Sequence, residues 1–163
     1  MNSGTFEIRP IKASDNNRVK TIVLSVLYEH GAKGEGYASS DPELESMFQA
    51  YQASNSVYFV LLENDEVVGG AGVGPLANAS DSWCELQKMY LLPVARGKGF
   101  GLKLMNTCLE AARKFKYNYC YIETLDNMLA AQSLYAKIGF KLVENRRGAT
   151  GHSSCPVFME LKL

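Results

Sequence analysis

The order of apolar and polar residues along the chain predicts a sheet that begins antiparallel. Alternating or short apolar runs, bounded by turn residues, occupy the segments 6–11, 57–62, 67–73, 83–92, 119–124, 141–144 and 156–161. Asn64 and Asp65 supply a tight turn between the second and third of these strands. Strands joined in this way pair as antiparallel neighbours.

The spacing of apolar residues also predicts helices. Positions three and four apart are apolar in the segments 14–27, 41–51, 97–115 and 129–138. Pro42 stands at a favoured first helical position, and Gly139 ends the last helix. Because a helix lies between the strands at 83–92 and 119–124, we expect those two strands to run parallel. The chain is therefore predicted to be mixed α/β, in a single domain that spans residues 1–163.

The composition disfavours several classes of protein. Seventeen basic residues balance 17 acidic ones, without a Lys/Arg run, so nucleic acid is not expected as a partner. No apolar run approaches the roughly 20 residues of a membrane span, so no membrane association is expected either, and the first residues lack the pattern of a secretory signal. The four cysteines include no C-x-x-C pair and the two histidines lie far apart, which predicts no metal site. We interpret the cysteines as reduced thiols in a cytoplasmic protein.

A glycine-rich turn between a predicted strand and a predicted helix carries the strongest chemical signal. The segment is Met89-Tyr90-Leu91-Leu92-Pro93-Val94-Ala95-Arg96-Gly97-Lys98-Gly99-Phe100-Gly101. The first turn of a helix has unpaired N–H groups and a positive dipole end, so it can bind an anion. Gly97, Gly99 and Gly101 would let a phosphate reach those amides. Arg96 and Lys98 would add positive charge there.

Other glycine patterns fit less well. The P-loop pattern G-x-x-x-x-G-K-[ST] is absent, and the dinucleotide fingerprint G-x-G-x-x-G differs from the G-x-G-x-G spacing found here. A second glycine set, at positions 69, 70, 72 and 74, follows a predicted strand with no helix after it. That set indicates a bulge or close backbone packing.

Two motifs resemble those of the GCN5-related N-acetyltransferase (GNAT) superfamily. R-x-x-G-x-G, filled by Arg96, Gly99 and Gly101, resembles the pyrophosphate-binding signature of that family. The run A-x-x-L-Y-x-x-x-G-F, at residues 131–140, resembles its next helix. The resemblance implies the acyl-CoA acyltransferase fold: a twisted mixed sheet of about seven strands, about four helices, and a V-shaped cleft between the fourth and fifth strands.

The same resemblance implies that acetyl-CoA binds in the cleft as co-substrate, with no metal. The implied cofactor-binding residues are Met89, Tyr90, Leu91, Arg96, Gly97, Lys98, Gly99, Phe100, Gly101, Leu102, Asn127, Met128, Ala131 and Tyr135. Many family members have asparagine seven residues before the tyrosine. This chain has Met128 there, and Asn127 lies one position earlier.

Two glutamates are candidates for the base that removes a proton from the acceptor amine. Glu85 resembles the base position of the histone-acetylating branch, and alternation predicts that it shares a strand face with Gln87, Met89 and Leu91. Glu123 resembles the position used in the ribosomal-protein-acetylating branch. We favour Glu85 and leave Glu123 as the alternative.

Two further groups complete the implied chemistry. The backbone N–H of Met89 could stabilise the oxyanion of the tetrahedral species. Tyr135 lies at the general-acid position of the family, and a hydroxyl pKa of ~10 suits a thiol leaving group.

The acceptor is predicted from two loops, 31–41 and 146–155. Acidic and aromatic residues in the first could bind an ammonium group, and basic residues in the second a carboxylate. These candidates are Glu35, Tyr37, Asp41, Arg146, Arg147 and His152. Together they indicate an amino-acid-like acceptor. Cys155 lies near His152, but the motifs imply direct transfer rather than a covalent enzyme intermediate.

We therefore predict an acetyltransferase that moves the acetyl group of acetyl-CoA to a primary amine of a small molecule by direct attack in a ternary complex. One alternative is a domain that senses acyl-CoA without turnover. Another is the same enzyme with a different acyl donor or a protein amine as acceptor. The last strand could also pair two subunits into a homodimer.

Overall fold

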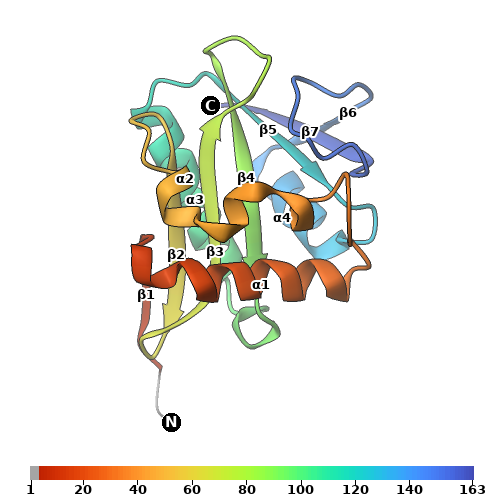
Figure 1. Ribbon diagram of the computed structural model, residues 1–163. Helices are drawn as coiled ribbons and strands as arrows, with labels where there is room; N and C mark the ends of the chain where they lie inside the picture. The colour runs from red at the N-terminus through yellow and green to blue at the C-terminus, as the bar shows by residue number, and fades with distance from the viewer. Residues whose placement is uncertain (1–3) are drawn as a thin grey trace.

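The computed structural model describes residues 4–163, which contain one seven-stranded sheet. Its strands are β1 (Phe6–Pro10), β2 (Val57–Glu63), β3 (Glu66–Pro75), β4 (Trp83–Leu91), β5 (Tyr119–Thr124), β6 (Lys141–Val143) and β7 (Val157–Lys162). They lie side by side in the order β1-β2-β3-β4-β5-β7-β6 (Figure 1). β4 and β5 are parallel and the other neighbours are antiparallel. The predicted mixed sheet is confirmed.

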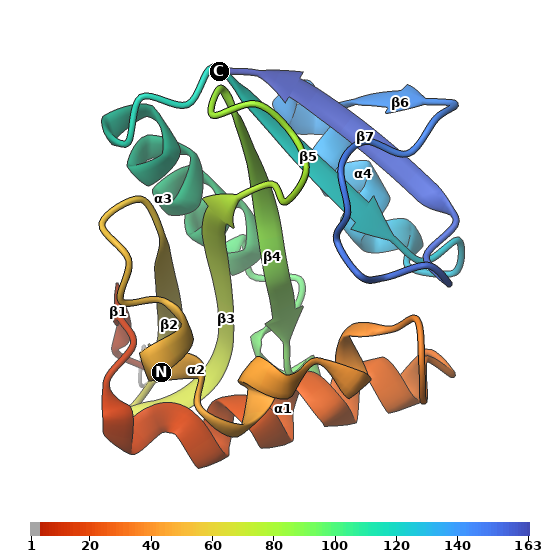
Figure 2. The same ribbon diagram turned by 45° about the horizontal axis from the view of Figure 1, so that its top comes forward.

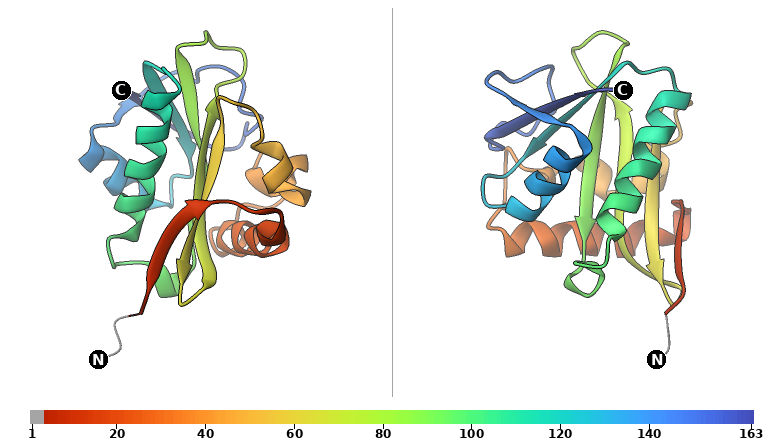
Figure 3. Two further views of the ribbon diagram at one scale, coloured as in Figure 1. Left: turned by 90° about the vertical axis from the view of Figure 1, so that its left-hand side faces the viewer. Right: turned by 180° about the vertical axis from the view of Figure 1, so that it is seen from behind.

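Helices cover both faces of this sheet. They are α1 (Asn16–Glu29), α2 (Met47–Ala50), α3 (Phe100–Lys114) and α4 (Leu129–Ile138), with short 3₁₀ turns at Ala13–Asp15, Ala38–Ser40, Pro42–Glu45 and Pro93–Ala95. Figure 3 shows α1 and α2 on one face and α3 and α4 on the other. One apolar core lies under α1 and a second under α3 and α4. None of the helices in residues 4–163 has both the length and the apolar character needed to span a membrane.

Two predicted helices are shorter in the structure. The segment 41–51 is divided into a 3₁₀ turn and α2, because Ser46 between them adopts a non-helical conformation with φ −152° and ψ 63°. The helix predicted from position 97 begins at Phe100 instead. Gly97 and Gly99 have φ of +71° and +79°, which a right-handed helix does not accept.

The glycines of β3 make room for two tyrosine rings. A Cβ atom at Gly70 would lie 2.6 Å from the ring of Tyr58, and one at Gly72 would lie 2.9 Å from the ring of Tyr51. The close packing predicted for this glycine set is confirmed. The Tyr58 hydroxyl donates a hydrogen bond of 2.8 Å to the carbonyl of Lys88, so the tyrosine layer supports the middle of β4.

The sheet opens between its two parallel strands. Only three residues of each strand pair, from Trp83 with Tyr119 to Glu85 with Tyr121. Figure 2 shows β4 and β5 close together where they begin and apart where they end. The remaining residues of β4 therefore lack a partner strand on the β5 side. This is the V-shaped cleft that the family resemblance implies.

Candidate active site

A bulge in β4 determines which side chains face each side of the cleft. Gly72 of β3 pairs with Gln87 but Gly70 pairs with Tyr90, so β4 has one extra residue between them. Lys88, within the bulge, has φ +49°. Beyond it the alternation is reversed.

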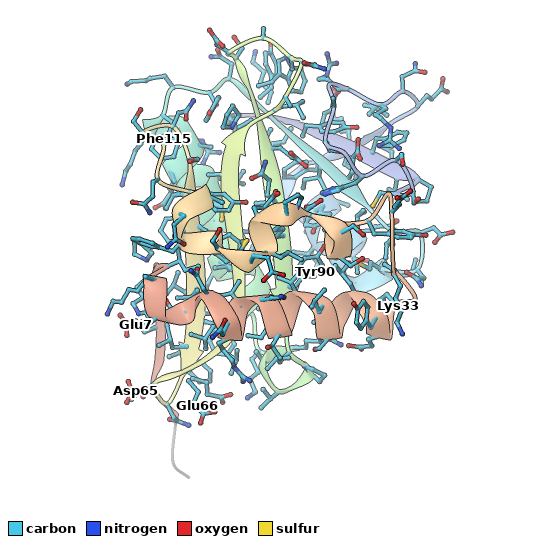
Figure 4. The ribbon with its side chains drawn as sticks, in the orientation of Figure 1. Glu7, Lys33, Asp65, Glu66, Tyr90 and Phe115 are labelled. Carbon is cyan, nitrogen blue, oxygen red and sulfur yellow. The ribbon has the colours of Figure 1, made fainter. Side chains whose placement is uncertain are left out.

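The prediction that Glu85, Gln87, Met89 and Leu91 share a strand face is therefore wrong. Met89 and Leu91 pack into the core under α3 and α4, whereas Tyr90 packs into the core under α1. Figure 4 shows Tyr90 between α1 and the segment that carries α2. An alternating pattern of apolar residues contains no signal for the inserted residue.

A groove of about 770 Å³ runs along the open part of the cleft to the first turn of α3. It is lined by all the residues implied for cofactor binding except Lys98 and Phe100. The ammonium of Lys98 is instead 3.2 Å from a carboxylate oxygen of Glu63. Phe100 is buried and stacks on Phe6, with ring centroids 4.0 Å apart. These two side chains point away from the groove, so the turn presents its backbone there.

The glycine turn is shaped to accept an anion. A Cβ atom at Gly97 or Gly99 would have no neighbour within 4 Å, so open space reaches the backbone at both positions. Gly99 is the N-cap residue of α3 and has no side chain to cap the amides of the first turn. Those amides and the positive end of the helix dipole suit a phosphate group.

Arg96 is engaged by the protein itself. Its Nε donates to the carbonyl of Leu91 at 2.9 Å, and its two terminal nitrogens donate to the carboxylate of Glu29 at 2.7 and 2.9 Å. The hydrogen bond with Glu29 raises the pKa of Arg96 and lowers that of Glu29. Arg96 thus ties the end of β4 to the end of α1 at the rim of the groove.

A smaller pocket, of about 40 Å³, adjoins the groove on the α1 side. The two cavities share four residues: Met89, Tyr90, Met128 and Tyr135. The smaller pocket also contains both candidate bases, together with Lys88, His152 and Cys155. A ligand in the groove and one in this pocket would therefore meet at Tyr135.

Glu85 has the properties of a base. It is only 6% exposed, and burial raises the pKa of its carboxyl to about 7. Gln87 Nε2 donates to Oε2 at 2.9 Å, while Oε1 has no hydrogen-bond partner in residues 4–163. In the described part of the chain, Ser39 Oγ is the one fully buried side-chain polar atom without a partner, so the free oxygen of Glu85 is accessible.

Glu123 is occupied by structural hydrogen bonds. Its side chain is 0% exposed, and its oxygens accept hydrogen bonds of 2.7 Å from the Tyr121 hydroxyl, the Arg146 guanidinium and the Thr150 hydroxyl. This carboxylate joins β5 to the loop before β7. A carboxylate that already accepts three hydrogen bonds, of about four that it can accept, is poorly placed to take a proton from a ligand.

Tyr135 is 5% exposed, and burial raises the pKa of its hydroxyl above the usual value. The hydroxyl therefore stays protonated at neutral pH, and before a ligand binds it is a weaker acid than the pKa of ~10 expected from the sequence. It has no hydrogen-bond partner in the described residues and is not fully enclosed, so it is open to the two cavities that the residue lines.

An ion network closes the pocket on the side of the loops. Asp41 Oδ2 accepts from Lys88 Nζ at 2.7 Å and from His152 Nε2 at 2.8 Å, and Lys88 also contacts Glu43 at 2.9 Å. Burial is the largest single influence and opposes the charged form of His152. The hydrogen bond with Asp41 and the negative charges of Asp41 and Glu85 together outweigh it and raise the pKa of His152. Sequence reasoning missed Lys88, because a lysine in a strand gives no signal that it is buried.

The other predicted acceptor-binding residues lie outside the pocket. Glu35 is exposed in its loop, and Tyr37 is half-buried against the core under α1. Arg146 donates to Glu123 and to three backbone carbonyls of its own loop. Arg147 stacks on the Trp83 ring, 3.9 Å from its centroid. Of the six residues that the sequence suggested for acceptor binding, His152 alone lines the pocket.

The sheet opened between parallel strands and the glycine turn beside it define the class of acyl-CoA acyltransferases. The model of the acetyltransferase (GNAT) family matches residues 24–140, and the chain belongs to this family. A relative is the uncharacterized N-acetyltransferase YjgM of Escherichia coli K12. The two are 37% identical over 153 residues, which are 93% of this chain and 92% of that protein. The chain is therefore an acetyltransferase.

Solved structures of the same fold agree. A GNAT acetyltransferase from Staphylococcus aureus Mu50 superimposes with a TM-score of 0.86 at 18% identity, covering 97% of this chain and 99% of that one. YncA from Salmonella typhimurium, solved with its cofactor acetyl-CoA, gives a TM-score of 0.75 at 23% identity, covering 97% and 94%. PaiA N-acetyltransferase from Thermoplasma acidophilum, in complex with coenzyme A, gives 0.78 at 18% identity, covering 98% and 99%. These likenesses confirm the predicted fold.

Proposed function

We propose that the chain transfers the acetyl group of acetyl-CoA to the primary amine of a small, amino-acid-like acceptor. The observation that carries this proposal is the junction of the two cavities at Tyr135, with the accessible oxygen of Glu85 in the smaller one. We assign this smaller cavity as the acceptor pocket. The groove and its open glycine turn fit a long ligand with a pyrophosphate group. Related structures with coenzyme A or acetyl-CoA bound support the same donor.

The residues of this chain take complementary roles in the transfer. Acetyl-CoA supplies the acetyl group as an activated thioester. Glu85 accepts a proton from the ammonium group of the acceptor, and the free amine then attacks the acetyl carbon. The backbone N–H of Met89 donates to the oxygen that gains negative charge. As the bond between the acetyl carbon and sulfur breaks, Tyr135 gives its proton to the departing thiolate, and the second proton lost by the acceptor nitrogen restores the Tyr135 hydroxyl.

Direct transfer is favoured over a covalent enzyme intermediate. Cys155 lines the acceptor pocket, but burial raises the pKa of its thiol to about 11. A protonated thiol is a weak nucleophile at neutral pH. Glu85, in contrast, is half ionised near pH 7 and needs no covalent step.

His152 is the candidate for recognition of a carboxylate on the acceptor. Its Nε2 is committed to Asp41, which favours the imidazolium form. Its Nδ1 has no partner in residues 4–163. A cationic N–H donor that lines the same pocket as the proton-accepting Glu85 matches a molecule that carries an amine close to a carboxylate.

Ligand binding and turnover test the proposal together. Acetyl-CoA should raise the melting temperature, by an amount that corresponds to ~2.7 kcal/mol at a hundred times its dissociation constant, whereas ATP and NAD should not. Free thiol should then appear only when an amine is added, and faster with amino acids than with amines that lack the carboxylate. A shift without thiol release from any amine would favour an acyl-CoA sensor. No shift with acetyl-CoA would contradict the donor.

Gly99→Val should abolish the thermal shift with acetyl-CoA. Gly99 has φ +79° and open space beside it, so the valine side chain would enter the groove at the amides of the first turn of α3. The positive φ also strains a β-branched residue by about 1–3 kcal/mol. Gly34→Val is the matched control, because Gly34 also has a positive φ and open space but does not line the groove. It should lose similar stability and keep its response to acetyl-CoA. An unchanged affinity in Gly99→Val would contradict the phosphate site.

A further inference from the structure

We propose that Gln87, held by the hydroxyl of Tyr51, is a positioning residue for Glu85, which fixes one carboxylate oxygen and leaves the other to take the proton. The inference rests on the proposed function, because it assumes that Glu85 is the base. It adds Gln87, which lines the smaller pocket beside Glu85, and Tyr51, which lines neither cavity.

The contacts form a chain of hydrogen bonds across the sheet. Tyr51, just after α2, donates from its hydroxyl to Gln87 Oε1 at 2.6 Å. Gln87 Nε2 then donates to Glu85 Oε2 at 2.9 Å. Gln87 and Glu85 lie two positions apart in β4, before the bulge, so both side chains face the α1 side.

The chemistry of the groups fixes the donor and acceptor at each hydrogen bond from Tyr51 to Glu85. An ionised carboxylate only accepts hydrogen bonds, so the NH₂ end of the Gln87 amide must face Glu85 and the oxygen end must face Tyr51. Burial raises the pKa of Tyr51 well above its usual value, so this hydroxyl remains a donor throughout the working pH range. Without Tyr51, the amide of Gln87 is free to rotate, and its oxygen would then accept a hydrogen bond from the protonated carboxyl of Glu85 and favour that form.

The glycines of β3 lie beside the hydrogen-bonded side chains of Tyr51 and Gln87. Gly72 and Gly74 pair with Gln87 and Glu85 in the register of the sheet. A Cβ atom at Gly72 would lie 2.9 Å from the Tyr51 ring, and one at Gly74 would lie 3.4 Å from Gln87 Oε1. A side chain at Gly72 would displace the Tyr51 ring, whereas a Cβ atom at Gly74 would only contact Gln87, so Gly72 is the glycine that makes room for this hydrogen-bond chain.

Several charged groups surround Glu85 and set the background for any pH effect. Lys88 from β4 and His152 from the loop before β7 favour its ionised form, and Glu123 from β5 opposes it. Tyr51 faces it from the segment after α2. Among these influences the hydrogen bond from Gln87 is the strongest that lowers the pKa, against the larger opposite effect of burial. Its removal should therefore favour the protonated carboxyl.

The test is the pH dependence of kcat/KM in Gln87→Met and Tyr51→Phe. In wild type kcat/KM should rise with pH around 7, and Glu85→Gln should remove that rise. In Gln87→Met the rise should move upward by about one pH unit, because a hydrogen bond to a charged group is lost. Activity at pH 7 should then fall about fivefold and recover near pH 9. Tyr51→Phe should move it in the same direction by less. Affinity for acetyl-CoA should not change in either variant.

Controls separate positioning from general damage. Tyr117→Phe removes a hydroxyl that donates to the Asn55 carbonyl at 2.9 Å, away from both cavities, and should leave the pH profile in place. Gln87→Glu keeps the length of the side chain but replaces the donor by a second carboxylate. It should therefore move the rise upward even if Gln87→Met folds poorly. An unmoved profile in the Gln87 variants, with the rise absent in Glu85→Gln, would overturn the inference and leave the proposed function intact. A rise that persists in Glu85→Gln would overturn both.

Discussion

Glu85→Gln should lower kcat about 10²–10⁴-fold at neutral pH, the usual contribution of a positioned general base. The amide cannot accept the proton of the acceptor ammonium, although it retains the shape of the side chain. Acetyl-CoA affinity should be unchanged, because Glu85 lines the acceptor pocket and not the groove. The measurement is kcat and KM across pH 5–9 by thiol release, with acetyl-CoA affinity measured separately.

The same substitution should make the protein more stable in alkaline solution. The folded carboxyl has a pKa of about 7 against an ordinary value of 4.5. Between these two values the unfolded chain has released the proton and the folded chain still holds it, so wild-type stability falls as pH rises through this window. The difference corresponds to about 3 kcal/mol above pH 7. Glu85→Gln should therefore melt at a higher temperature than wild type at pH 8, and no higher at pH 4.

Glu123→Gln is the matched comparison for the choice of base. The Glu123 side chain is fully buried, but Arg146 is 31% exposed, so loss of this charge should cost about 1–3 kcal/mol of stability. Folded Glu123→Gln should retain the rise of kcat/KM with pH. If the rise disappears in Glu123→Gln and persists in Glu85→Gln, the base is Glu123.

Tyr135→Phe should lower kcat about 10²–10⁴-fold while affinity for acetyl-CoA and thermal stability remain near wild type. The Tyr135 hydroxyl has no partner in the described residues, so its removal breaks no hydrogen bond inside the protein. The ring should keep its contact with Phe140, whose centroid is 6.0 Å away. The loss should therefore be confined to turnover. Steady-state kinetics should show the lower kcat, and a melting curve should show unchanged stability.

Tyr119→Phe controls for the loss of a tyrosine hydroxyl. Tyr119 begins β5, stacks on Trp83 with centroids 4.6 Å apart, and lines neither cavity. Its substitution should leave kcat unchanged. A kcat of Tyr135→Phe equal to that of Tyr119→Phe would contradict the role of Tyr135 as general acid.

The parts of the molecule that depend on local sequence could be predicted. The glycine turn lies between β4 and α3 as expected, and Gly139, with φ +116°, ends α4 at the predicted position. Such features are determined by a few neighbouring residues, because only glycine accepts these conformations at little cost. The same holds for the alternation that identifies β4 up to Gln87.

The features that could not be predicted depend on contacts between distant residues. Tyr51 and Gln87 lie 36 positions apart, and Asp41 and His152 lie 111 apart. Nothing in either short segment indicates that these partners meet. Lys88 is the clearest case: a non-glycine residue with φ +49° is held in place by the Tyr58 hydroxyl, and the bulge that results redirects every later side chain of β4.

β4 and β5 are joined only by their short parallel pairing, and they diverge beyond it. This three-residue pairing contains Cys84 opposite Cys120, two small side chains that are both fully buried. We expect a slight displacement at this pairing to change the separation of β4 and β5 farther along the cleft. We therefore expect the packing of Cys84 against Cys120 to affect the width of the cleft, although neither residue lines either cavity.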